Sequence, residues 1–548
     1  MSGTRTQLTL VTRDGTGFNR FDQLANALSW LVAGVLLATG IAGCASPPVN
    51  VARKVSHALA DPLQTNLGQA FAMQSEVHPG QSGFHIVATG FEALHSRIAL
   101  ADAAEHTLDL QYFTVGDDHT TDVLLQRLIA AGQRGVRVRI LLDDIYSSNR
   151  EFARRASVLV PNSEVRLFNP FRTGGVSGLG RLFELAGDAK RLNRRMHNKL
   201  WVADNVLGIV GGRNLSAEYF DANSEANFSD LDVLAVGPVV RMLSRCFDEY
   251  WNSSPAVPIA GLLNKKLSRE QASRVRPEFD ARRSDPVATH DERMPRQAEL
   301  AGRLKNGNLP LTWARATAGC DRPDKPETGS GTTGIEHYWP DSTADASSTK
   351  FELIVVSPYF IPTAHDVQHL GSMRQRGVRV AVLTNSLAST DSPAAHGGYA
   401  RYRADLLRRG IELFEMRPLP GALHPLKHRW RMVTPATLHA KMVIVDRAFA
   451  IIGSSNQDPR SRRLNTESWV AIDSPALVSE MIALFEEGTQ SDHAYRVVLR
   501  DPNESGDALE WHTVDDGHAV RHASEPHVRW WLWAWSSLLS TVVPEDLL

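Results

Sequence analysis

Short apolar stretches alternate with longer amphipathic stretches in the first third of the chain. Residues 108–113 read LDLQYF, and residues 136–142 form a second short run rich in Val, Ile and Leu. Between them, residues 121–131 carry an apolar stripe at helical spacing: Val123, Leu124, Leu128 and Ile129. This pattern predicts a strand, a helix and a second strand. Such alternation favours an α/β sandwich around a largely parallel central sheet.

The same pattern recurs in the second half of the chain. LDLQYF at 108–113 is answered by LIVVSPYF at 353–360, and GVRVRILLDD at 135–144 is answered by GVRVAVLTNS at 377–386. The period is about 240 residues, which is too long for a solenoid repeat and suits two fused copies of one domain.

Composition marks the segments around the two copies. The stretch between them is charged and then rich in Pro, Gly and Thr, which predicts a linker with some helix and one flexible loop. The predicted divisions are a signal and tether at 1–50, a first domain with its lead-in at 51–254, a linker or insert at 255–350, a second domain at 351–500 and a Trp-rich tail at 501–548.

Each copy carries an imidazole, an ammonium, a carboxylate and an amide at matched spacing. In a strand, alternate residues face the same side, so each His projects beside its Lys. Two cations and two amides suit a tetrahedral anion such as a phosphate group. The eight residues are His197, Lys199, Asp204, Asn214, His439, Lys441, Asp446 and Asn456.

Two histidines at one phosphate group can divide the chemistry between them. One attacks phosphorus and forms a covalent phosphoenzyme; the other protonates the leaving oxygen and then takes a proton from the acceptor. This chemistry can proceed without a metal, and the sequence shows no carboxylate cluster suited to bind one. We therefore expect neither a metal nor another cofactor.

Overall composition bears mainly on partner and compartment. Hydrophobic residues make up 43% and charged residues 22% of the 548 positions, as is typical of a globular protein. The net charge of −2 gives no general attraction to nucleic acid, and we expect no nucleic-acid partner. The three cysteines lack a zinc-binding spacing, and the sequence leaves open whether Cys246 and Cys320 pair.

The N-terminal segment has the features of a secretion signal. Arginines precede an uncharged run at 24–52, and IAGC within it resembles the bacterial lipoprotein box, in which Cys44 bears the lipid. Ala45 and Ser46 follow without an aspartate, a pattern that implies outer-membrane sorting. We expect a membrane-attached protein of the bacterial cell envelope that faces the periplasm. An uncleaved inner-membrane anchor is the alternative.

The paired motifs resemble the phospholipase D superfamily over most of residues 85–500. The segments GGRNLSAEYFDANSEANFSDLDVLAVGP and GSSNQDPRSRRLNTE are more similar to the bacterial cardiolipin synthase C-type branch than to secreted phospholipases or small nucleases. The resemblance implies an α/β fold of two fused α/β/α sandwich domains with pseudo-two-fold symmetry. It also implies an active site at their interface.

The resemblance implies a role for each residue of the motifs. His197 is the nucleophile and His439 the general acid and base, although pseudo-symmetry allows the reverse assignment. The residues that hold the phosphate are Lys199, Lys441, Asn214 and Asn456.

Acidic residues downstream of the motifs orient the histidines in this family. The matching positions are Glu467 in the second copy and Asp230 in the first, with Asp232 as the alternative. An acid bonded to one imidazole nitrogen fixes the tautomer that lets the other nitrogen attack. Asp204 and Asp446 complete the catalytic motif, or have a structural role instead.

Other features bear on the substrate. Basic segments at 190–199 and 427–431 could attract anionic head groups or be solvated loops. Tyr359 and Tyr399 resemble family motifs beside the cleft, or are ordinary aromatics of the core or rim. Tryptophans of the tail suit a bilayer interface or a helix packed on the second domain: Trp530, Trp531, Trp533 and Trp535.

The predicted function is transfer of a phosphatidyl group through a phosphohistidine to phosphatidylglycerol, which yields cardiolipin. The donor is phosphatidylglycerol or phosphatidylethanolamine. A phospholipase D that hydrolyses lipid to phosphatidic acid uses the same site, and the balance depends on how dry the pocket is. The remaining alternatives are a nuclease and a non-catalytic lipid-binding lipoprotein, although both motifs are intact here.

Overall fold

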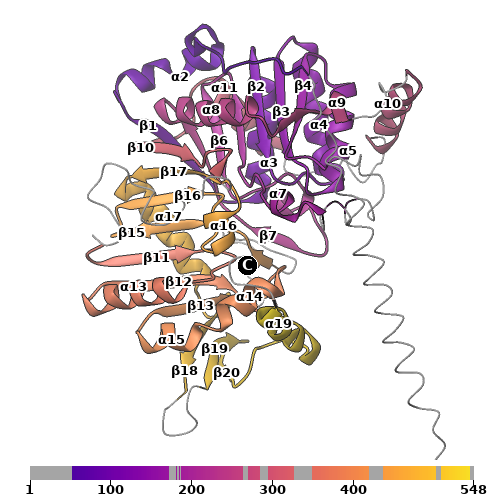
Figure 1. The fold of residues 1–548 in the computed structure, drawn as a ribbon. Coiled ribbons are helices and arrows are strands. Elements are labelled where there is room, and N and C mark those ends of the chain that lie inside the picture. Colours follow the sequence, from indigo (N-terminus) through magenta and orange to yellow (C-terminus); the bar gives the residue numbers. More distant parts are fainter. Residues whose placement is uncertain are drawn as a thin grey trace, which may run out of the picture.

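The computed structural model describes residues 52–171, 187–262, 269–283, 294–325, 349–418, 436–500 and 508–542, together with Arg181 and Glu184. The predicted signal with Cys44, most of the Pro/Gly/Thr-rich loop and the basic segment 427–431 lie outside these residues. No helix in the described part of the chain is long and apolar enough to cross a membrane. Figure 1 shows two halves of similar design that follow one another in sequence.

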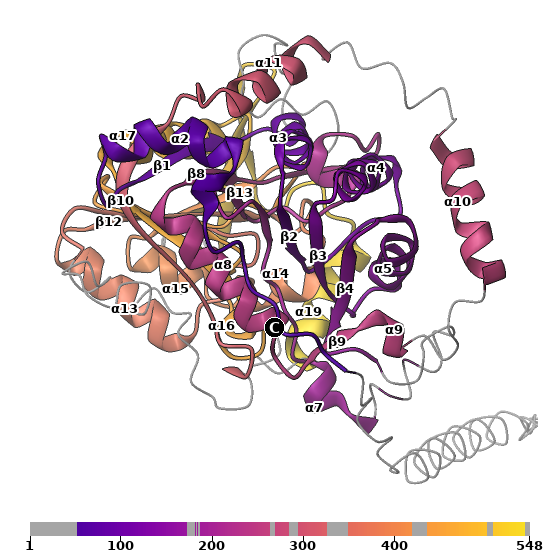
Figure 2. The same cartoon turned by 90° about the horizontal axis from the view of Figure 1, so that it is seen from above.

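The first half is a mixed sheet with the strand order β1–β8–β6–β5–β2–β3–β4–β9. The predicted strand, helix and strand are present as β2, α4 and β3. Figure 2 shows α3, α4 and α5 on one face of β2–β4 and α8 on the other. The strands are β1 (Ser82–Val87), β2 (Thr107–Tyr112), β3 (Arg137–Asp143), β4 (Ser163–Phe168), β5 (Leu200–Ala203), β6 (Leu207–Gly211), β8 (Asp232–Val236) and β9 (Ala256–Pro258). The helices are α2 (Asn66–Glu76), α3 (Gly90–Ala103), α4 (His119–Gln133), α5 (Ser147–Leu159), α7 (Ala189–Leu192), α8 (Pro238–Trp251) and α9 (Ile259–Leu262).

The second half repeats this order as β17–β16–β15–β11–β12–β13–β18 and extends it with β19 and β20. Its strands are β11 (Glu352–Val356), β12 (Arg379–Asn385), β13 (Glu412–Met416), β15 (Met442–Val445), β16 (Phe449–Gly453), β17 (Ser468–Asp473), β18 (Ala494–Leu499), β19 (Leu509–Asp515) and β20 (His518–His522). Its helices are α13 (Ala364–Gln375), α14 (Pro393–Ala400), α15 (Arg403–Arg408), α16 (Pro459–Arg463), α17 (Pro475–Gly488) and α19 (Trp530–Val542).

The expectation of a largely parallel sheet is wrong for both halves. Only the central strands run parallel: β2, β3 and β4 in the first half, and β11, β12 and β13 in the second. The remaining neighbours are antiparallel; β5 and β6, for example, are joined by residues 204–206 alone. A turn this short cannot make the crossover that parallel pairing requires. Periodicity shows that a strand is buried but not the direction in which it pairs.

One strand of the segment between the copies joins the two sheets. β10 (Thr312–Cys320) pairs with β1 through residues 312–314 and with β17 through residues 315–320. In the sequence, β10 follows α10 (Arg269–Arg283) and α11 (Met294–Lys305) and precedes the second half. A disulfide bond links Cys320, at the end of β10, to Cys246 of α8. The segment predicted as a linker therefore contains a structural element common to both halves.

The hydrophobic core consists of three apolar layers, of which one is shared by the two halves. One layer lies between the first sheet and its outer helices, and another between the second sheet and its own. The third is a single buried cluster that includes Phe247 of α8, Met481 of α17 and inner-face residues of both sheets. Because this cluster is continuous across the molecule, loops from the two halves are held against one another at a fixed position.

Candidate active site

Each sequence motif lies on a tight β-hairpin. His197 and Lys199 precede β5, and His439 and Lys441 precede β15. The first hairpin turns through Asp204 and Asn205 with φ of 52° and 55°, and the second turns through Asp446 and Arg447 with φ of 51° and 56°. Asp and Asn tolerate this left-handed conformation better than most residues. The spacing from His to Asp therefore covers the short approach to the strand and the strand itself.

The carboxylates of the two motif aspartates bind backbone and not the histidines. Asp204 accepts hydrogen bonds at 2.8 Å from the N–H groups of residues 105–107, where β2 begins. Asp446 does the same for residues 350–352 at the start of β11. Seven extended residues place each aspartate about 20 Å from its histidine. These hydrogen bonds favour the structural alternative for Asp204 and Asp446 over a catalytic role.

Backbone pairing between the halves brings each histidine next to an acid from the other copy. β7 (Asn227–Ser229) pairs in parallel with β14 (Ala436–Leu438), so that Asp230 and His439 follow in register. On the other side, Met196 forms a parallel bridge with Thr466, so that His197 and Glu467 follow in register. Both contacts connect residues more than 200 positions apart.

The side chains complete this exchange. His197 Nδ1 lies 2.9 Å from Glu467 Oε2, and His439 Nδ1 lies 2.6 Å from Asp230 Oδ2. The predicted acids are therefore both present, but each orients the histidine of the opposite copy. The alternative, Asp232, instead pairs at 2.9 Å with the buried Arg97. An Nδ1–H donated to a carboxylate leaves the Nε2 lone pair of each imidazole available.

The two lysines are buried beside the histidines. Lys199 Nζ donates to the backbone oxygen of His197 at 2.6 Å, and Lys441 Nζ donates to the backbone oxygen of His439. Lys441 Nζ also lies 2.9 Å from His439 Nδ1. This nitrogen cannot both donate to Asp230 and accept from Lys441, and the shorter distance to Asp230 favours donation to the carboxylate. Lys441 therefore keeps donors for an anion.

The two motif asparagines have different partners. Asn214 accepts a hydrogen bond from the Thr114 N–H at 3.1 Å and donates to the Tyr219 hydroxyl at 3.0 Å. That hydroxyl lies 3.3 Å from His439 Nε2. Sequence reasoning missed this contact, and its only sign was the place of Tyr219 within the segment GGRNLSAEYF. Asn456 Oδ1 is buried and has no hydrogen-bond partner among the described residues.

Aromatic rings restrict the two imidazoles. Phe113, the last residue of LDLQYF, meets His197 edge-on with ring centroids 4.8 Å apart. Tyr219 and Phe228 lie at 5.0 and 5.1 Å from His439 in the same measure. Tyr359 bonds to Asp391 at 2.8 Å, whereas Tyr399 packs in the second core. Rings that pack against an imidazole exclude water and hold its orientation.

Burial sets the protonation of the site. It lowers the pKa of His197 to about 4 against the opposing charge of Glu467, and it lowers the pKa of His439 well below the usual value with the help of Lys441. Burial also lowers the pKa of Lys199 to about 7 and that of Lys441 to about 8. Near neutral pH the imidazoles are thus neutral, as a nucleophile must be, and the ammonium groups are close to titration.

Glu467 has contacts beyond its ion pair with His197, and these hold its backbone in place. Asp321 Oδ2 accepts from the Glu467 N–H at 2.9 Å and from the buried Lys325 ammonium at 2.8 Å. The Asp321 N–H in turn donates to the Glu467 carbonyl at 2.9 Å. Because Asp321 follows Cys320, the disulfide with Cys246 anchors the segment that supports this carboxylate. Composition had marked this region only as part of a linker.

The groups gathered here are suited to phosphoryl chemistry. Two oriented imidazoles and two ammonium groups can bind a phosphodiester and stabilise negative charge that develops on its oxygens. Among the described residues, no group of three or more His, Cys, Asp or Glu side chains could hold a metal ion. A reaction without metal stays a prediction.

Known proteins are similar to this chain over both of its halves. The protein-family model "Cardiolipin synthase, PLD-like domain" matches residues 98–251 and 343–488, which is more than half of the chain. "Cardiolipin synthase C" of Escherichia coli (strain K12) is 39% identical over 425 residues, 77% of this chain and 88% of that protein. A Helicobacter pylori protein, named only "Uncharacterized protein", is 29% identical over 86% of this chain and 91% of its own length.

A solved structure supports the fold. Phosphatidylserine synthase of Haemophilus influenzae Rd KW20 covers 80% of this chain and 95% of its own, with a TM-score of 0.51 and 13% identity. At this identity the likeness concerns architecture alone. The duplicated motif, the two-sheet fold and the match of both halves together show that the chain belongs to the cardiolipin synthase family with PLD-like domains, that is, to the phospholipase D superfamily.

Proposed function

We propose that this protein is a membrane-associated phosphatidyltransferase of cardiolipin synthase type that works through a phosphohistidine. The observation that carries the proposal is the pair of buried histidines, each bonded through Nδ1 to a carboxylate from the opposite half. The 39% identity to a cardiolipin synthase supports the substrate class. Donor lipids are phosphatidylglycerol or phosphatidylethanolamine, and phosphatidylglycerol is the acceptor.

In the first step, His197 Nε2 attacks the phosphorus of the donor. A P–N bond forms while the bond from phosphorus to the head-group oxygen breaks. His439 takes up a proton from solvent when the anionic phosphodiester binds beside it, and it gives this Nε2 proton to the leaving oxygen. Lys199, Lys441 and the motif asparagines hold the non-bridging oxygens, where negative charge increases. Neutral His197, with its Nδ1 bonded to Glu467, is in the state that attack requires.

In the second step, a hydroxyl of the acceptor resolves the phosphoenzyme. His439 Nε2 removes the hydroxyl proton as the oxygen attacks phosphorus and the P–N bond breaks. Asp230 stabilises the imidazolium that forms, since its carboxylate accepts from Nδ1. Water can take the place of the acceptor, which would give phosphatidic acid. Aromatic rings packed at both histidines favour a site that excludes bulk water.

We further propose attachment to the bacterial cell envelope on the periplasmic side. The Cys246–Cys320 disulfide supports an oxidising compartment. The IAGC motif supports lipid attachment at Cys44, outside the described residues. The tail helix α19 supports contact with a bilayer, because Trp530 is 81% exposed and Trp531, Trp533 and Trp535 are each at least half exposed. Indole rings favour the membrane interface.

The test is incubation of the purified protein with vesicles of labelled phosphatidylglycerol, with and without phosphatidylethanolamine, followed by analysis of the lipids. We expect cardiolipin, and no product from His197→Ala. A label on the phosphatidylethanolamine head group identifies the donor. Phosphatidic acid with free glycerol would identify a phospholipase instead, and cleavage of single-stranded DNA with intact lipid would identify a nuclease.

A further inference from the structure

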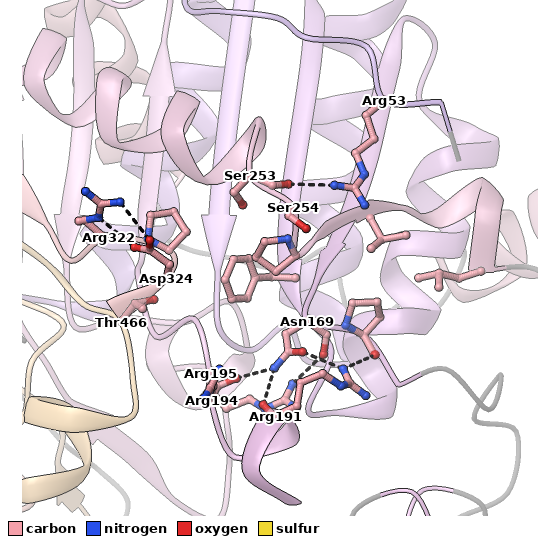
Figure 3. A pocket seen from close by; sticks show the side chains of 16 residues that line it. Arg53, Asn169, Arg191, Arg194, Arg195, Ser253, Ser254, Arg322, Asp324 and Thr466 are labelled. Carbon is pink, nitrogen blue, oxygen red and sulfur yellow. Dashed lines mark hydrogen bonds and ion pairs between the residues drawn. The ribbon is translucent and has the colours of Figure 1, made fainter. Parts of the chain in front are cut away.

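A pocket rich in arginine is lined mainly by residues of the first half (Figure 3). It has a volume of about 520 Å³. Figure 3 shows Arg191, Arg194 and Arg195 grouped below Asn169, with Arg53 and Arg322 on other sides of the space. Three of these arginines belong to the basic segment 190–199 that the sequence analysis singled out. The proposed reaction does not use any of them.

The pocket walls carry more positive than negative charge. Among the lining residues Asp324 is the acid, and it pairs with Arg322. Arg191 and Arg195 have acidic partners behind the wall, whereas Arg53 donates to the backbone oxygen of Ser253 at 3.4 Å. An anion that enters the pocket would therefore meet guanidinium groups on several sides.

Arg195 has an unused donor at this wall. Its side chain is 98% buried, since only 2% of its surface is exposed, and its Nη1 donates to Asp143 at 3.2 Å. Its Nη2 is buried and has no hydrogen-bond partner among the described residues. Buried polar groups almost always have a partner, so Arg195, a residue that lines the cavity, has a donor to spare for an anion bound there.

Part of the pocket wall is apolar. Phe168, Pro170, Val257 and Leu262 contribute carbon surface next to the arginines. A free inorganic anion would gain nothing from this surface, whereas a phosphodiester flanked by glycerol would cover it. The chemistry of the lining thus fits the head group of an anionic phospholipid.

The backbone connects this pocket to the histidine site. Arg195 precedes His197 by two residues, a separation of about 7 Å in extended chain. Thr466, another lining residue, precedes Glu467, and its N–H and C=O bond to Arg195 and His197 respectively. The residues that line the pocket are therefore direct chain neighbours of His197 and of its acid, Glu467.

We propose that this pocket binds the phosphodiester of the acceptor phospholipid, so that the hydroxyl of the same head group reaches the phosphohistidine. The proposal rests on the proposed transfer function, which requires an acceptor lipid with a phosphate of its own. The donor phosphate occupies the histidine site, and the acceptor phosphate occupies the arginine pocket.

The test combines direct binding with product analysis in the full-length protein. The probes are glycerophosphoglycerol, which is the water-soluble head group, and inorganic phosphate, each titrated by calorimetry. Arg53→Gln removes a charge at the rim, and Arg195→Lys keeps a cation for Asp143 while it removes Nη2. The control is Arg315→Gln, because Arg315 is an exposed arginine that pairs with Asp473 away from the pocket.

We expect Arg53→Gln and Arg195→Lys each to weaken binding of glycerophosphoglycerol by about tenfold, as for loss of a charged hydrogen bond. The ratio of cardiolipin to phosphatidic acid should fall by a similar factor, while Arg315→Gln matches the unmodified protein. Formation of labelled phosphoenzyme from the donor should fall less than this ratio.

Three results would overturn the proposal. The first is an equal loss of rate in formation of the phosphoenzyme and in transfer to the acceptor. The second is tight binding of inorganic phosphate without binding of glycerophosphoglycerol. The third is unchanged binding of glycerophosphoglycerol in both arginine variants. If the unmodified protein makes only phosphatidic acid, the transfer function fails, yet loss of head-group binding in the two arginine variants would still identify the pocket as a phosphodiester site.

Discussion

The two histidine motifs share one scaffold but not one environment. Each His precedes a hairpin strand, each hairpin turns at a left-handed aspartate, and each imidazole bonds to an acid from the other half. The acids differ, however: Glu467 serves His197, and Asp230 serves His439. A duplicated domain has thus conserved its geometry between its halves while the surroundings of the two imidazoles have diverged.

The two acids differ most in the groups that hold them in place and in the direction of their pKa shifts. Glu467 also accepts from the Ser454 hydroxyl and is held through its backbone by Asp321. Burial opposes ionisation of both carboxylates, but His197 and its neighbours keep the pKa of Glu467 below the usual value, whereas burial raises that of Asp230. A firmly ionised acid suits a permanent orienting role at a nucleophile. An acid nearer to neutrality suits an imidazole that gains and loses a proton during turnover.

The largest expected effect comes from the histidines themselves. His197→Ala and His439→Ala should each reduce turnover by about ten-thousand-fold, as is typical when a catalytic side chain is removed. They should differ in the intermediate: His197→Ala prevents labelling of the protein by labelled lipid, whereas His439→Ala slows its release and traps it. Peptide mapping of the phosphohistidine checks this. Label on His439 in the unmodified protein would reverse the two roles.

A smaller effect is expected from the acids. Glu467→Gln and Asp230→Asn should each cost about a hundredfold, because the imidazole loses orientation and tautomer but keeps its position. Rapid-quench kinetics should separate them: Glu467→Gln slows formation of the phosphoenzyme, whereas Asp230→Asn also slows its resolution, because His439 acts in both steps. If instead Glu467→Gln slowed only resolution and Asp230→Asn slowed only formation, the bond of each acid to the histidine of the other half would have no functional consequence.

The lysines predict an alkaline limit to activity. Lys199 and Lys441 have pKa values of about 7 and about 8, so both carry charge below these values and lose it as the pH rises. We expect kcat/KM to fall by at least about tenfold between pH 7 and pH 9, which is the loss from Lys441 alone, while kcat falls less because a bound phosphate keeps the ammonium groups protonated. Lys441→Arg, which keeps its charge, should extend the active range. A flat profile to pH 9 would contradict lowered pKa values.

The smallest effect on activity is expected at the turn aspartates. Asp446→Asn keeps a residue that accepts the left-handed turn but weakens the hydrogen bonds to residues 350–352. It should lower the free energy of unfolding by about 2 kcal/mol and leave kcat within about twofold. Denaturant unfolding and kinetics on the same sample check this, with Asp204→Asn as the matched change in the other half. A hundredfold loss of kcat would return these residues to the catalytic set.

Several features could be predicted from sequence because they depend on local pattern. Apolar periodicity located β2, α4 and β3, and repetition of the His–Lys–Asp–Asn order indicated two copies of one domain. The resemblance to the family's motifs indicated Glu467 and Asp230 as the acids that orient the histidines, and both lie beside a histidine. Spacing could not separate a catalytic aspartate from a structural one, because the position of a carboxylate at the far end of a strand depends on which backbone lies across from it.

The sequence by itself determined the chemical groups of this protein, since duplication and spacing are properties of one chain read in order. Only the tertiary structure decided which groups meet: the exchange of acids between halves, the strand β10 shared by both sheets, and the bond between Cys246 and Cys320. These contacts join residues 74 to 270 positions apart. The physical reason is that long-range pairing follows from burial of one continuous core between the halves, and no local periodicity encodes the partner of a strand or a side chain.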